Sequence, residues 1–246
     1  MISFKNHRTF ITGAGSGIGL ATARLFLQLG AEVFASDINS AALNALKTES
    51  GENPRLSLSD GDVSSPSDCR RLVEEAVAGF GQIDSLIHSA GIYSAEKKVH
   101  QLSDDEWLKT IDINANGTFY ICRAVIPHLS NNSAIVNVAS IAAHQGSPLH
   151  PQYAAAKGAV LSLSKSLAVD LAPKTRVNVV SPGVIETPMT ESFRNEERGK
   201  NMLRRTPLGR FGRAEEIAGP IAFLCSPLAS YVTGEAIQIN GGFYIS

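Results

Sequence analysis

A tyrosine and a lysine lie four residues apart in a stretch of good helix formers. Tyr153 and Lys157 are separated by three alanines, and this i,i+4 spacing places the phenol and the ammonium on one helix face. A phenol with a pKa of about 10 is ionised in about one molecule per thousand at pH 7. A neighbouring lysine stabilises the phenolate and lowers that pKa, which would make Tyr153 a usable acid or base. The same spacing also occurs by accident on solvated helices, so the surrounding residues decide its meaning.

A serine lies thirteen residues before Tyr153, at the end of a β-rich run at 134–138. Ligands of doubly wound folds bind at the carboxyl edge of the parallel sheet, so the hydroxyl of this residue, Ser140, could hold the substrate oxygen. His144 and His150 flank the same expected substrate mouth. Functional residues concentrate in such loops, which favours a substrate contact, while isolated surface histidines are more often merely solvated.

A glycine-rich segment at 12–19 follows the first β-rich run and precedes a helical pattern at 20–29. Glycines allow the backbone to approach a pyrophosphate, whose charge the free N–H groups and the positive end of the helix dipole would meet. The strict G-x-G-x-x-G spacing fails, because position 18 is isoleucine and position 20 is leucine. Its place between strand and helix nevertheless favours a phosphate role over an ordinary turn. The expected cofactor contacts here are Gly13, Ser16, Gly17, Ile18 and Gly19.

Asp37 ends the second β-rich run, 18 residues beyond Gly19. An acidic side chain there can accept hydrogen bonds from both adenosine ribose hydroxyls. A 2′-phosphate would meet a like charge, at a cost on the order of 4 kcal/mol at about 4 Å and an effective dielectric near 20. No lysine or arginine occurs at 38–46 to offset it. The sequence therefore predicts NAD as the cofactor in preference to NADP, and a helix-capping role for Asp37 is compatible with this.

Seven short apolar runs alternate with longer helical patterns. The runs are 8–12, 32–36, 55–58, 84–88, 134–138, 176–180 and 236–239. Alternation of this kind predicts right-handed βαβ units, and hence a Rossmann-type, doubly wound α/β fold with a parallel sheet of about seven strands and helices on both faces.

Helix starts are marked by capping residues. Ser65 before Pro66 predicts one, and Ser103 with Glu106 has the capping-box spacing that predicts another. The acidic run at 104–106 is therefore interpreted as a helix cap in preference to a catalytic carboxylate pair.

The composition is that of a globular enzyme-sized chain. With 246 residues, 43% of them apolar, 18% charged and a net charge of -1, a single domain spanning 1–246 is expected, without nucleic acid or anionic lipid as a partner. Cys69, Cys122 and Cys225 are widely spaced and predict reduced core thiols. No metal spacing is found, and neither a secretory signal nor a membrane-length apolar run occurs. The expected location is the cytoplasm.

The segment at 188–213 differs from the rest of the chain. It holds seven basic and three acidic residues, a difference of +4, and its apolar periodicity is poor. Such a segment suits a mobile surface element. We expect it to close over the substrate as a lid, and its charge weakly favours an anionic substrate or carrier.

Taken in order, the motifs resemble those of the short-chain dehydrogenase/reductase family over essentially the whole chain. They are T-G-x-x-x-G-I-G at 12–19, Asp62-Val63, Asn114, Ser140, Tyr153 with Lys157, the segment 182–187, and the pairs Gly234-Glu235 and Gly241-Gly242. Several motifs in the right order are far more specific than any one of them. The resemblance implies a small alcohol or ketone substrate and a homotetramer.

The resemblance also implies roles for four polar residues. Tyr153 would be the acid/base for a carbonyl or alcohol, and Ser140 would polarise the same oxygen. Lys157 would hold the nicotinamide ribose in addition to tuning Tyr153. Asn114 would carry a water that links Lys157 to solvent.

Further cofactor contacts are implied by the resemblance alone. They are Asp62 and Val63 at the adenine, Ala90 and Gly91 at the ribose, Ile185 and Thr187 at the carboxamide, and Pro182 and Gly183 in the same segment. One departure lies beside them. The family usually has Asn-Ala-Gly after its fourth strand, and Ser89 replaces that asparagine here, so we expect weaker local bonding with the cofactor site kept.

The predicted function is an NAD(H)-dependent oxidoreductase that interconverts a secondary alcohol and a ketone, with Tyr153 as acid/base. A second reading within the same family is a 3-oxoacyl-carrier-protein reductase, which generally uses NADPH. A third, of another class, is a dinucleotide-sensing protein without turnover. The complete set of Asn114, Ser140, Tyr153 and Lys157 favours an enzyme.

Overall fold

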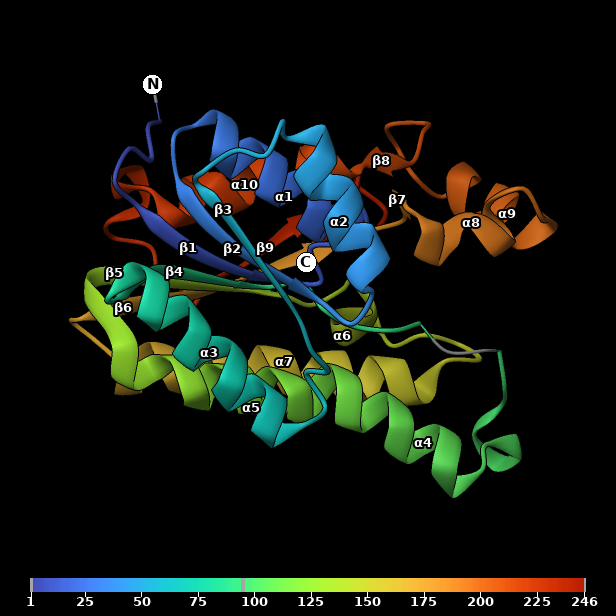
Figure 1. Ribbon diagram of the computed structural model, residues 1–246. Helices are drawn as coiled ribbons and strands as arrows, with labels where there is room; N and C mark the ends of the chain where they lie inside the picture. Colours follow the sequence, from blue (N-terminus) through green and yellow to red (C-terminus); the bar gives the residue numbers. More distant parts are fainter. Residues whose placement is uncertain (1, 94–95, 246) are drawn as a thin grey trace.

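Seven parallel strands form the central sheet of the protein (Figure 1). The computed structural model describes residues 2–93 and 96–245. The strands are β1 (Arg8–Thr12), β2 (Glu32–Asp37), β3 (Leu56–Asp60), β4 (Ile83–His88), β5 (Leu129–Val138), β6 (Thr175–Pro182) and β9 (Ala236–Ile239), in the spatial order β3-β2-β1-β4-β5-β6-β9. Each predicted β-rich run is a strand, which confirms the doubly wound α/β fold. The largest difference is the start of β5, where Leu129 already pairs with Ile83 before a shift in register.

Helices cover both faces of this sheet (Figure 1). One face carries α1 (Gly17–Gln28), α2 (Ser40–Glu49) and α10 (Ala214–Cys225), and the other carries α3 (Pro66–Phe80), α5 (Gly117–Val125) and α7 (Pro151–Asp170). α4 (Asp104–Ile111) runs into α5 through a π-helical stretch, Asp112–Asn116. Shorter helices are α6 (Ala142–Gln145), α8 (Pro188–Arg194), α9 (Glu197–Arg204) and the 3-10 turns Val99–Gln101, Ile126–His128 and Pro227–Ala229.

The hydrophobic core is split by the sheet into two layers. Phe10 and Ile11, adjacent on β1, are both fully buried, because successive side chains of a strand point to opposite faces and helices cover each of them. Phe10 belongs to the cluster that includes Leu72 of α3, and Ile11 to the one that includes Phe26 of α1. Continuous apolar runs are therefore strands buried on both sides.

Two predicted helix starts are confirmed by their caps. The Ser65 hydroxyl accepts a hydrogen bond from the Asp68 N–H at 3.3 Å, with Pro66 as the first residue of α3. At α4 the Ser103 hydroxyl accepts from the Glu106 N–H at 3.3 Å, and the Glu106 carboxylate accepts from the Ser103 N–H at 3.0 Å. The acidic run at 104–106 is thus a helix cap.

The order of the strands reverses between β1 and β4. Strands added after β1 extend the sheet to one side, and those from β4 onward extend it to the other. The connections after these two strands therefore diverge to opposite faces and leave a crevice at their carboxyl ends, where ligands of such sheets bind.

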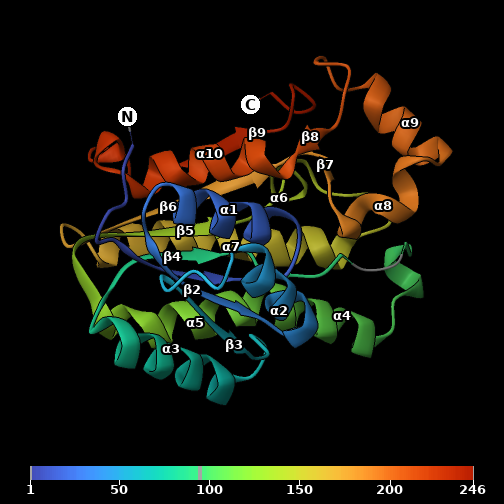
Figure 2. The ribbon, with the colours of Figure 1, turned by 45° about the horizontal axis from the view of Figure 1, so that its top comes forward.

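The segment 188–213 forms α8, α9 and a two-stranded sheet with the preceding residues, in which β7 (Ile185–Glu186) pairs with β8 (Gly212–Arg213). Figure 2 shows α8 and α9 standing clear of both helix layers, beside β7 and β8. Phe193 and Gly199 are buried within it, while most of its other residues are exposed, which accounts for the poor periodicity. Across 2–93 and 96–245, the structure contains no helix that is both long and apolar enough to span a bilayer.

A buried histidine joins the ends of the two central strands. His88 Nδ1 hydrogen bonds the Thr12 hydroxyl at 2.8 Å, and Thr12 Oγ1 also accepts from the Ala90 N–H at 3.4 Å. His88 Nε2 is buried and has no hydrogen-bond partner in the described part of the chain. Burial lowers the pKa of His88 to about 3, so the ring is held neutral.

Stability should therefore depend on pH through His88. The unfolded chain protonates this ring near its ordinary pKa of about 6.5, whereas the fold does so only near about 3. Between these values the unfolded state binds more protons, so the free energy of unfolding should fall by about 1.4 kcal/mol for each unit that the pH is lowered. Urea unfolding at pH 7 and pH 5 should show a smaller drop for His88→Asn than for the unsubstituted protein. Equal drops would mean that His88 is not buried as a neutral ring.

Candidate active site

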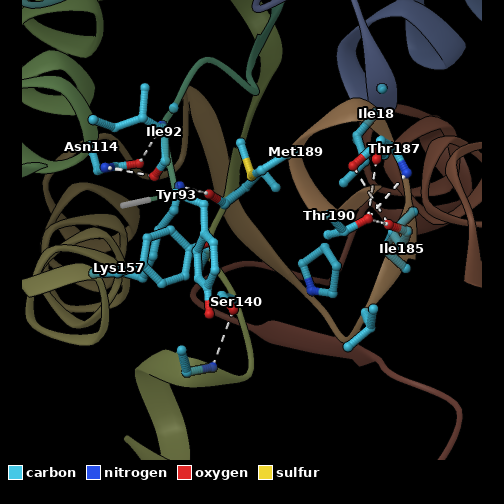
Figure 3. Close-up of a pocket in the computed structure, with 18 of the residues that line it drawn as sticks. Ile18, Ile92, Tyr93, Asn114, Ser140, Lys157, Ile185, Thr187, Met189 and Thr190 are labelled. Carbon is cyan, nitrogen blue, oxygen red and sulfur yellow. Dashed lines mark hydrogen bonds between the residues drawn. The ribbon is translucent and has the colours of Figure 1, made fainter. Parts of the chain in front are cut away.

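A cavity of about 780 Å³ opens at the carboxyl edge of the sheet. Its lining includes most of the residues that the sequence singles out: Gly13, Ser16, Gly17, Ile18, Asp37, Asp62, Val63, Ala90, Gly91, Asn114, Ser140, Tyr153, Lys157, Pro182, Gly183, Ile185 and Thr187. These positions are spread over the chain from the first strand to β7, and the sheet brings them to one place. Figure 3 shows Asn114 and Lys157 on one side of the cavity and Ile18 and Thr187 on the other.

The glycine loop makes a close approach between the ends of β1 and β4. Gly13 has φ +69, and a Cβ built there would lie 2.6 Å from the Ala90 nitrogen. Ser16 precedes α1 without making a side-chain cap, which leaves the first N–H groups of that helix to meet an anion. The loop is therefore shaped for a phosphate group, as the sequence predicts.

Gly19 does not line the cavity. A Cβ at Gly19 would lie 2.0 Å from the carbonyl oxygen of Gly13, so this glycine lets α1 pack directly against its own loop. Its predicted direct contact with the cofactor stays a prediction, and the structure shows a packing role for it instead of a place in the cavity wall. Gly19 packs beneath the glycine loop, behind the residues of that loop that line the cavity.

Asp37 is held at the cavity wall by backbone N–H groups. Its Oδ2 accepts from the Gly15 N–H at 2.9 Å, and its Oδ1 accepts from the Asn39 N–H at 2.9 Å. The cap of α2 is Asn39, whose side chain accepts from the Ala42 N–H at 3.1 Å. Asp37 is therefore not the helix cap, and its carboxylate is oriented by the loop beside the cavity. The neighbouring lining residues at 36–38 and 61–63 include no lysine or arginine.

Asn114 lies in the π-helical stretch, where the wider turn brings its side chain toward the loop after β4. The buried amide donates to the carbonyl oxygens of Thr110 at 3.0 Å and Ile92 at 3.2 Å, and its Oδ1 accepts from the Ile92 N–H at 3.2 Å. A Cβ on Gly91 would lie 2.6 Å from that oxygen. One hydrogen bond of the amide group therefore holds the loop and the other returns to α4, and the water-carrying role of Asn114 stays a prediction.

The phenol and the ammonium on α7 are both buried against the end of β5. Lys157 Nζ donates to the Val138 carbonyl at 2.9 Å and lies 5.8 Å from the centroid of the Tyr153 ring. The Tyr153 hydroxyl hydrogen bonds Ser140, and the Ser140 hydroxyl accepts from the Ala142 N–H at 3.2 Å. The predicted convergence of Ser140, Tyr153 and Lys157 is present.

The electrostatics of this pair differ from the expectation. Burial raises the pKa of Tyr153 to about 12, and the hydrogen bond with Ser140 offsets only part of this rise. Burial also lowers the pKa of Lys157 to about 8. The pKa of Tyr153 is therefore shifted in the direction opposite to the predicted lowering, because removal from water disfavours the charged form of each group.

The two histidines predicted at the substrate mouth lie behind it. His144 Nε2 hydrogen bonds the Ser181 hydroxyl at 3.0 Å, and its ring stacks on Tyr244. His150 is buried at the start of α7 and stacks on Tyr93 with ring centroids 4.3 Å apart. Neither histidine lines the cavity. Both side chains are used in packing, so the structure gives no support to the predicted substrate contacts.

Other residues that line the cavity belong to no sequence motif. They are Tyr93, Met189, Phe193, Arg198, Met202 and Phe243. Tyr93 follows Ala90 and Gly91 in the loop after β4, and an aromatic residue so near an expected cofactor loop is the one signal that could have identified it. Ser89, the departure from the family pattern, donates its N–H to the Thr12 carbonyl at 3.3 Å, and within the described residues its hydroxyl makes no hydrogen bond.

Known proteins share this fold. The family described as "Enoyl-(Acyl carrier protein) reductase" matches residues 13–244. A crystal structure from Brucella melitensis, described as "Short-chain dehydrogenase/reductase SDR:Glucose/ribitol dehydrogenase", is 45% identical with a TM-score of 0.96 and covers 100% of this chain and 99% of that one. The chain belongs to the short-chain dehydrogenase/reductase family.

Two curated relatives illustrate the range of the family. The 3-oxoacyl-(acyl-carrier-protein) reductase of Thermotoga maritima is 41% identical over 96% of this chain and 96% of its own length. The cyclohexanol dehydrogenase of an Acinetobacter species is 37% identical over 98% of this chain and 96% of its own. The protein is accordingly an oxidoreductase of this family, which implies a nicotinamide dinucleotide cofactor. The uncapped start of α1, the tight contact at Gly13 and the oriented Asp37 carboxylate fit such a group.

The close contact at Gly13 should be visible in stability. Gly13→Ala adds a methyl group against Ala90 at a residue with φ +69, while Gly51→Ala adds one at φ +66 with no atom within 4 Å. Both variants lose the conformational freedom of glycine. Gly13→Ala should lower the free energy of unfolding by about 1–3 kcal/mol more than Gly51→Ala, because it also overpacks the loop. Urea unfolding of the two variants measures this difference, and equal losses would contradict the close approach.

Proposed function

We propose that the protein is an NAD(H)-dependent oxidoreductase that interconverts a secondary alcohol and a ketone. The observation that carries the proposal is that Ser140, Tyr153 and Lys157 lie together at the wall of one cavity. The oriented carboxylate of Asp37 lines the same cavity. A small-molecule substrate suits a cavity of this size. The relative named as a cyclohexanol dehydrogenase supports an alcohol as substrate.

The chain's own residues account for the proton. In the oxidation direction Tyr153 accepts the hydroxyl proton of the substrate, and in the reduction direction it donates one to the carbonyl oxygen. Ser140, already hydrogen bonded to Tyr153, holds the same oxygen. Lys157 is buried beside them and supplies the positive charge that favours the phenolate. A bound nicotinamide ring supplies the hydride acceptor or donor.

Asp37 supports NAD over NADP. Its two oxygens are fixed by the N–H groups of Gly15 and Asn39, so the carboxylate cannot swing away without losing both bonds. A 2′-phosphate would meet this charge without a basic residue from the same wall. The ribose hydroxyls of NAD are donors that suit it.

Tyr153→Phe tests the acid/base role. Removal of the hydroxyl should lower turnover by about 10³-fold, because general acid–base catalysis is lost, while the affinity for NADH should change little. Rates are followed by nicotinamide absorbance over a panel of alcohols and ketones, and affinity by NADH fluorescence. Tyr231→Phe is the matched control, since Tyr231 is fully exposed and outside the cavity. Undiminished turnover of Tyr153→Phe would end the proposed mechanism.

Asp37→Asn tests the cofactor preference. The substitution removes the charge but keeps an oxygen for the Gly15 N–H. The unsubstituted protein should have a higher kcat/KM with NADH than with NADPH, and the variant should narrow this ratio by about tenfold or more. Asp60→Asn is the control, because Asp60 pairs with Asp37 in the sheet but is absent from the cavity wall. Equal or better rates of the unsubstituted protein with NADPH would contradict the role given to Asp37.

The relatives favour a second function in the same family. Several are named 3-oxoacyl-(acyl-carrier-protein) reductases, and the excess of basic residues at 188–213 suits an anionic carrier. Preference for NADPH and for an acyl thioester over simple ketones would support that reading. A protein that binds NADH and turns over no member of the panel would instead be a dinucleotide sensor.

The proposal includes a lid formed by residues 188–213. Met189, Phe193, Arg198 and Met202 from α8 and α9 line the cavity, although both helices stand clear of the core layers. Elements of this kind open and close over bound substrate in many enzymes.

The homotetramer belongs to the same proposal. Trp107, Leu108 and Phe119 are exposed on α4 and α5, and exposed apolar side chains of neighbouring helices suit contact between subunits.

A further inference from the structure

Tyr93 is packed between the lid and the phenol assigned as acid/base. It lies in the loop after β4, and its ring contacts three others. His150 is stacked on it at 4.3 Å between centroids, with the rings inclined by 19°. Tyr153 meets it edge to face at 4.9 Å and 84°, and Phe193 of α8 lies 6.0 Å away. Figure 3 shows Tyr93 inside the cavity, between Lys157 and Met189.

The hydroxyl of Tyr93 is held from the lid. Arg198 of α9 donates a hydrogen bond to it and forms an ion pair with Glu96. The same guanidinium lies over the Phe193 ring, 4.5 Å from its centroid, and 5.6 Å from the centroid of Tyr93. One side chain of α9 thus binds the loop after β4 through two of its residues.

On one side Tyr93 packs against buried residues of the core, and on the other side it contacts α8 and α9. His150 and Tyr153 are buried and belong to the first turn of α7 or its cap. Arg198 and Phe193 belong to α9 and α8, which stand clear of the core layers (Figure 2). Movement of those helices would remove Arg198 from the Tyr93 hydroxyl and leave the Tyr93 ring held from one side alone.

We propose that Tyr93 is a positioning residue for Tyr153 and that Arg198 sets its position from the lid. With Arg198 bound, the Tyr93 ring packs against Tyr153, fixes the orientation of the phenol and keeps water from it. When the lid moves away, the ring is released and the phenol loses both its orientation and its dry environment. The inference rests on the proposed acid/base role of Tyr153, and it ties that role to the position of 188–205.

The orientation of Tyr153 matters because a small misplacement of a reacting group lowers the rate strongly. The contacts of Arg198 also have a simpler interpretation. Arg198 could form an ordinary surface ion pair with Glu96, which contributes little to stability and nothing to catalysis. The two interpretations differ in one respect. An ordinary ion pair does not require the Tyr93 hydroxyl, whereas the proposed coupling does.

Three variants separate these interpretations. Tyr93→Phe keeps the ring and removes the hydroxyl that Arg198 binds, and Arg198→Gln removes the guanidinium. The double variant combines them. Arg204→Gln is the matched control, because Arg204 lies on the same helix, is exposed, pairs with Glu197 and is not part of the cavity wall. Arg198→Lys keeps a donor and should recover part of the loss.

Hydrogen exchange of 188–205 in the presence of NADH gives the first measurement. Tyr93→Phe and Arg198→Gln should each raise exchange there about threefold or more, and Arg204→Gln should leave it unchanged. The second measurement is kcat and KM for the fastest alcohol of a panel that includes cyclohexanol. Each single variant should lower kcat about tenfold with little change in the KM for NAD, and the double variant should be no slower than the slower single one, since both changes break the same contact.

A third measurement reports on Tyr153 itself. The apparent pKa of its phenol is obtained from ultraviolet phenolate absorbance, as the difference between each protein and its Tyr153→Phe counterpart. Water entry beside the ring should lower this pKa toward its ordinary value in Arg198→Gln, because burial is the main cause of its rise. Arg198→Gln decides this measurement, since the Tyr93 hydroxyl raises the Tyr153 pKa by itself and Tyr93→Phe would lower that pKa without any water entry. Arg204→Gln should leave the apparent pKa of Tyr153 unchanged.

The outcomes are distinct. Additive losses in kcat, or raised exchange with an unchanged kcat and phenol titration, would overturn the coupling and leave Arg198 as an ordinary ion pair. Unchanged exchange in both single variants would overturn it as well. If the unsubstituted protein turned over no alcohol or ketone, the proposed function would fail, while exchange and the phenol titration would still decide whether Arg198 and Tyr93 control Tyr153.

Discussion

The end of β5 provides partners for Tyr153 and Lys157, two of the polar groups that α7 buries, and the rest of the site depends on this. An ammonium and a phenol removed from water are costly unless each has a partner. Val138 provides a carbonyl for Lys157, and Ser140 provides a hydroxyl for Tyr153. Val138 at the end of β5 and Ser140 just after it therefore bind two neighbouring polar side chains of α7. A shift of β5 by one residue would exchange the faces of the strand and separate both pairs.

The remaining walls of the site follow from the point where the strand order reverses. β1 and β4 lie side by side there, and the loop after β1 approaches the loop after β4 so closely that Gly13 has no room for a side chain. Asn114 holds the second of these loops from the π-helical turn between α4 and α5. The loop after β4 that borders the glycine loop therefore also carries Tyr93, which faces Tyr153. The glycine loop, Tyr153 and Arg198 of α9 all contact this one short segment.

Much of the fold could be predicted from the sequence, because its signals are local. Continuous apolar runs such as 8–12 are strands buried on both faces, and capping residues such as Ser65 and Ser103 start helices where expected. The start of β5 was less predictable, since its first residues are partly polar and pair across an irregular register. Most of the predicted site residues line one cavity, and their roles stay predictions. His144 and His150 do not line it, because their packing partners come from elements distant in the chain.

The sequence by itself determined the order of the elements, the spacing of Tyr153 and Lys157 on one helix face, and the acidic residue after β2, because these depend on residues near one another in the chain. The tertiary structure decided how those groups behave. Burial raises the pKa of Tyr153 and lowers that of Lys157. The packing of α7 against β5 produces this burial. Gly19 serves packing, Asp37 is left to the cavity because Asn39 caps α2, and Arg198 reaches Tyr93 across 105 residues of chain. Such outcomes depend on surfaces that meet only after folding, so no local pattern contains them.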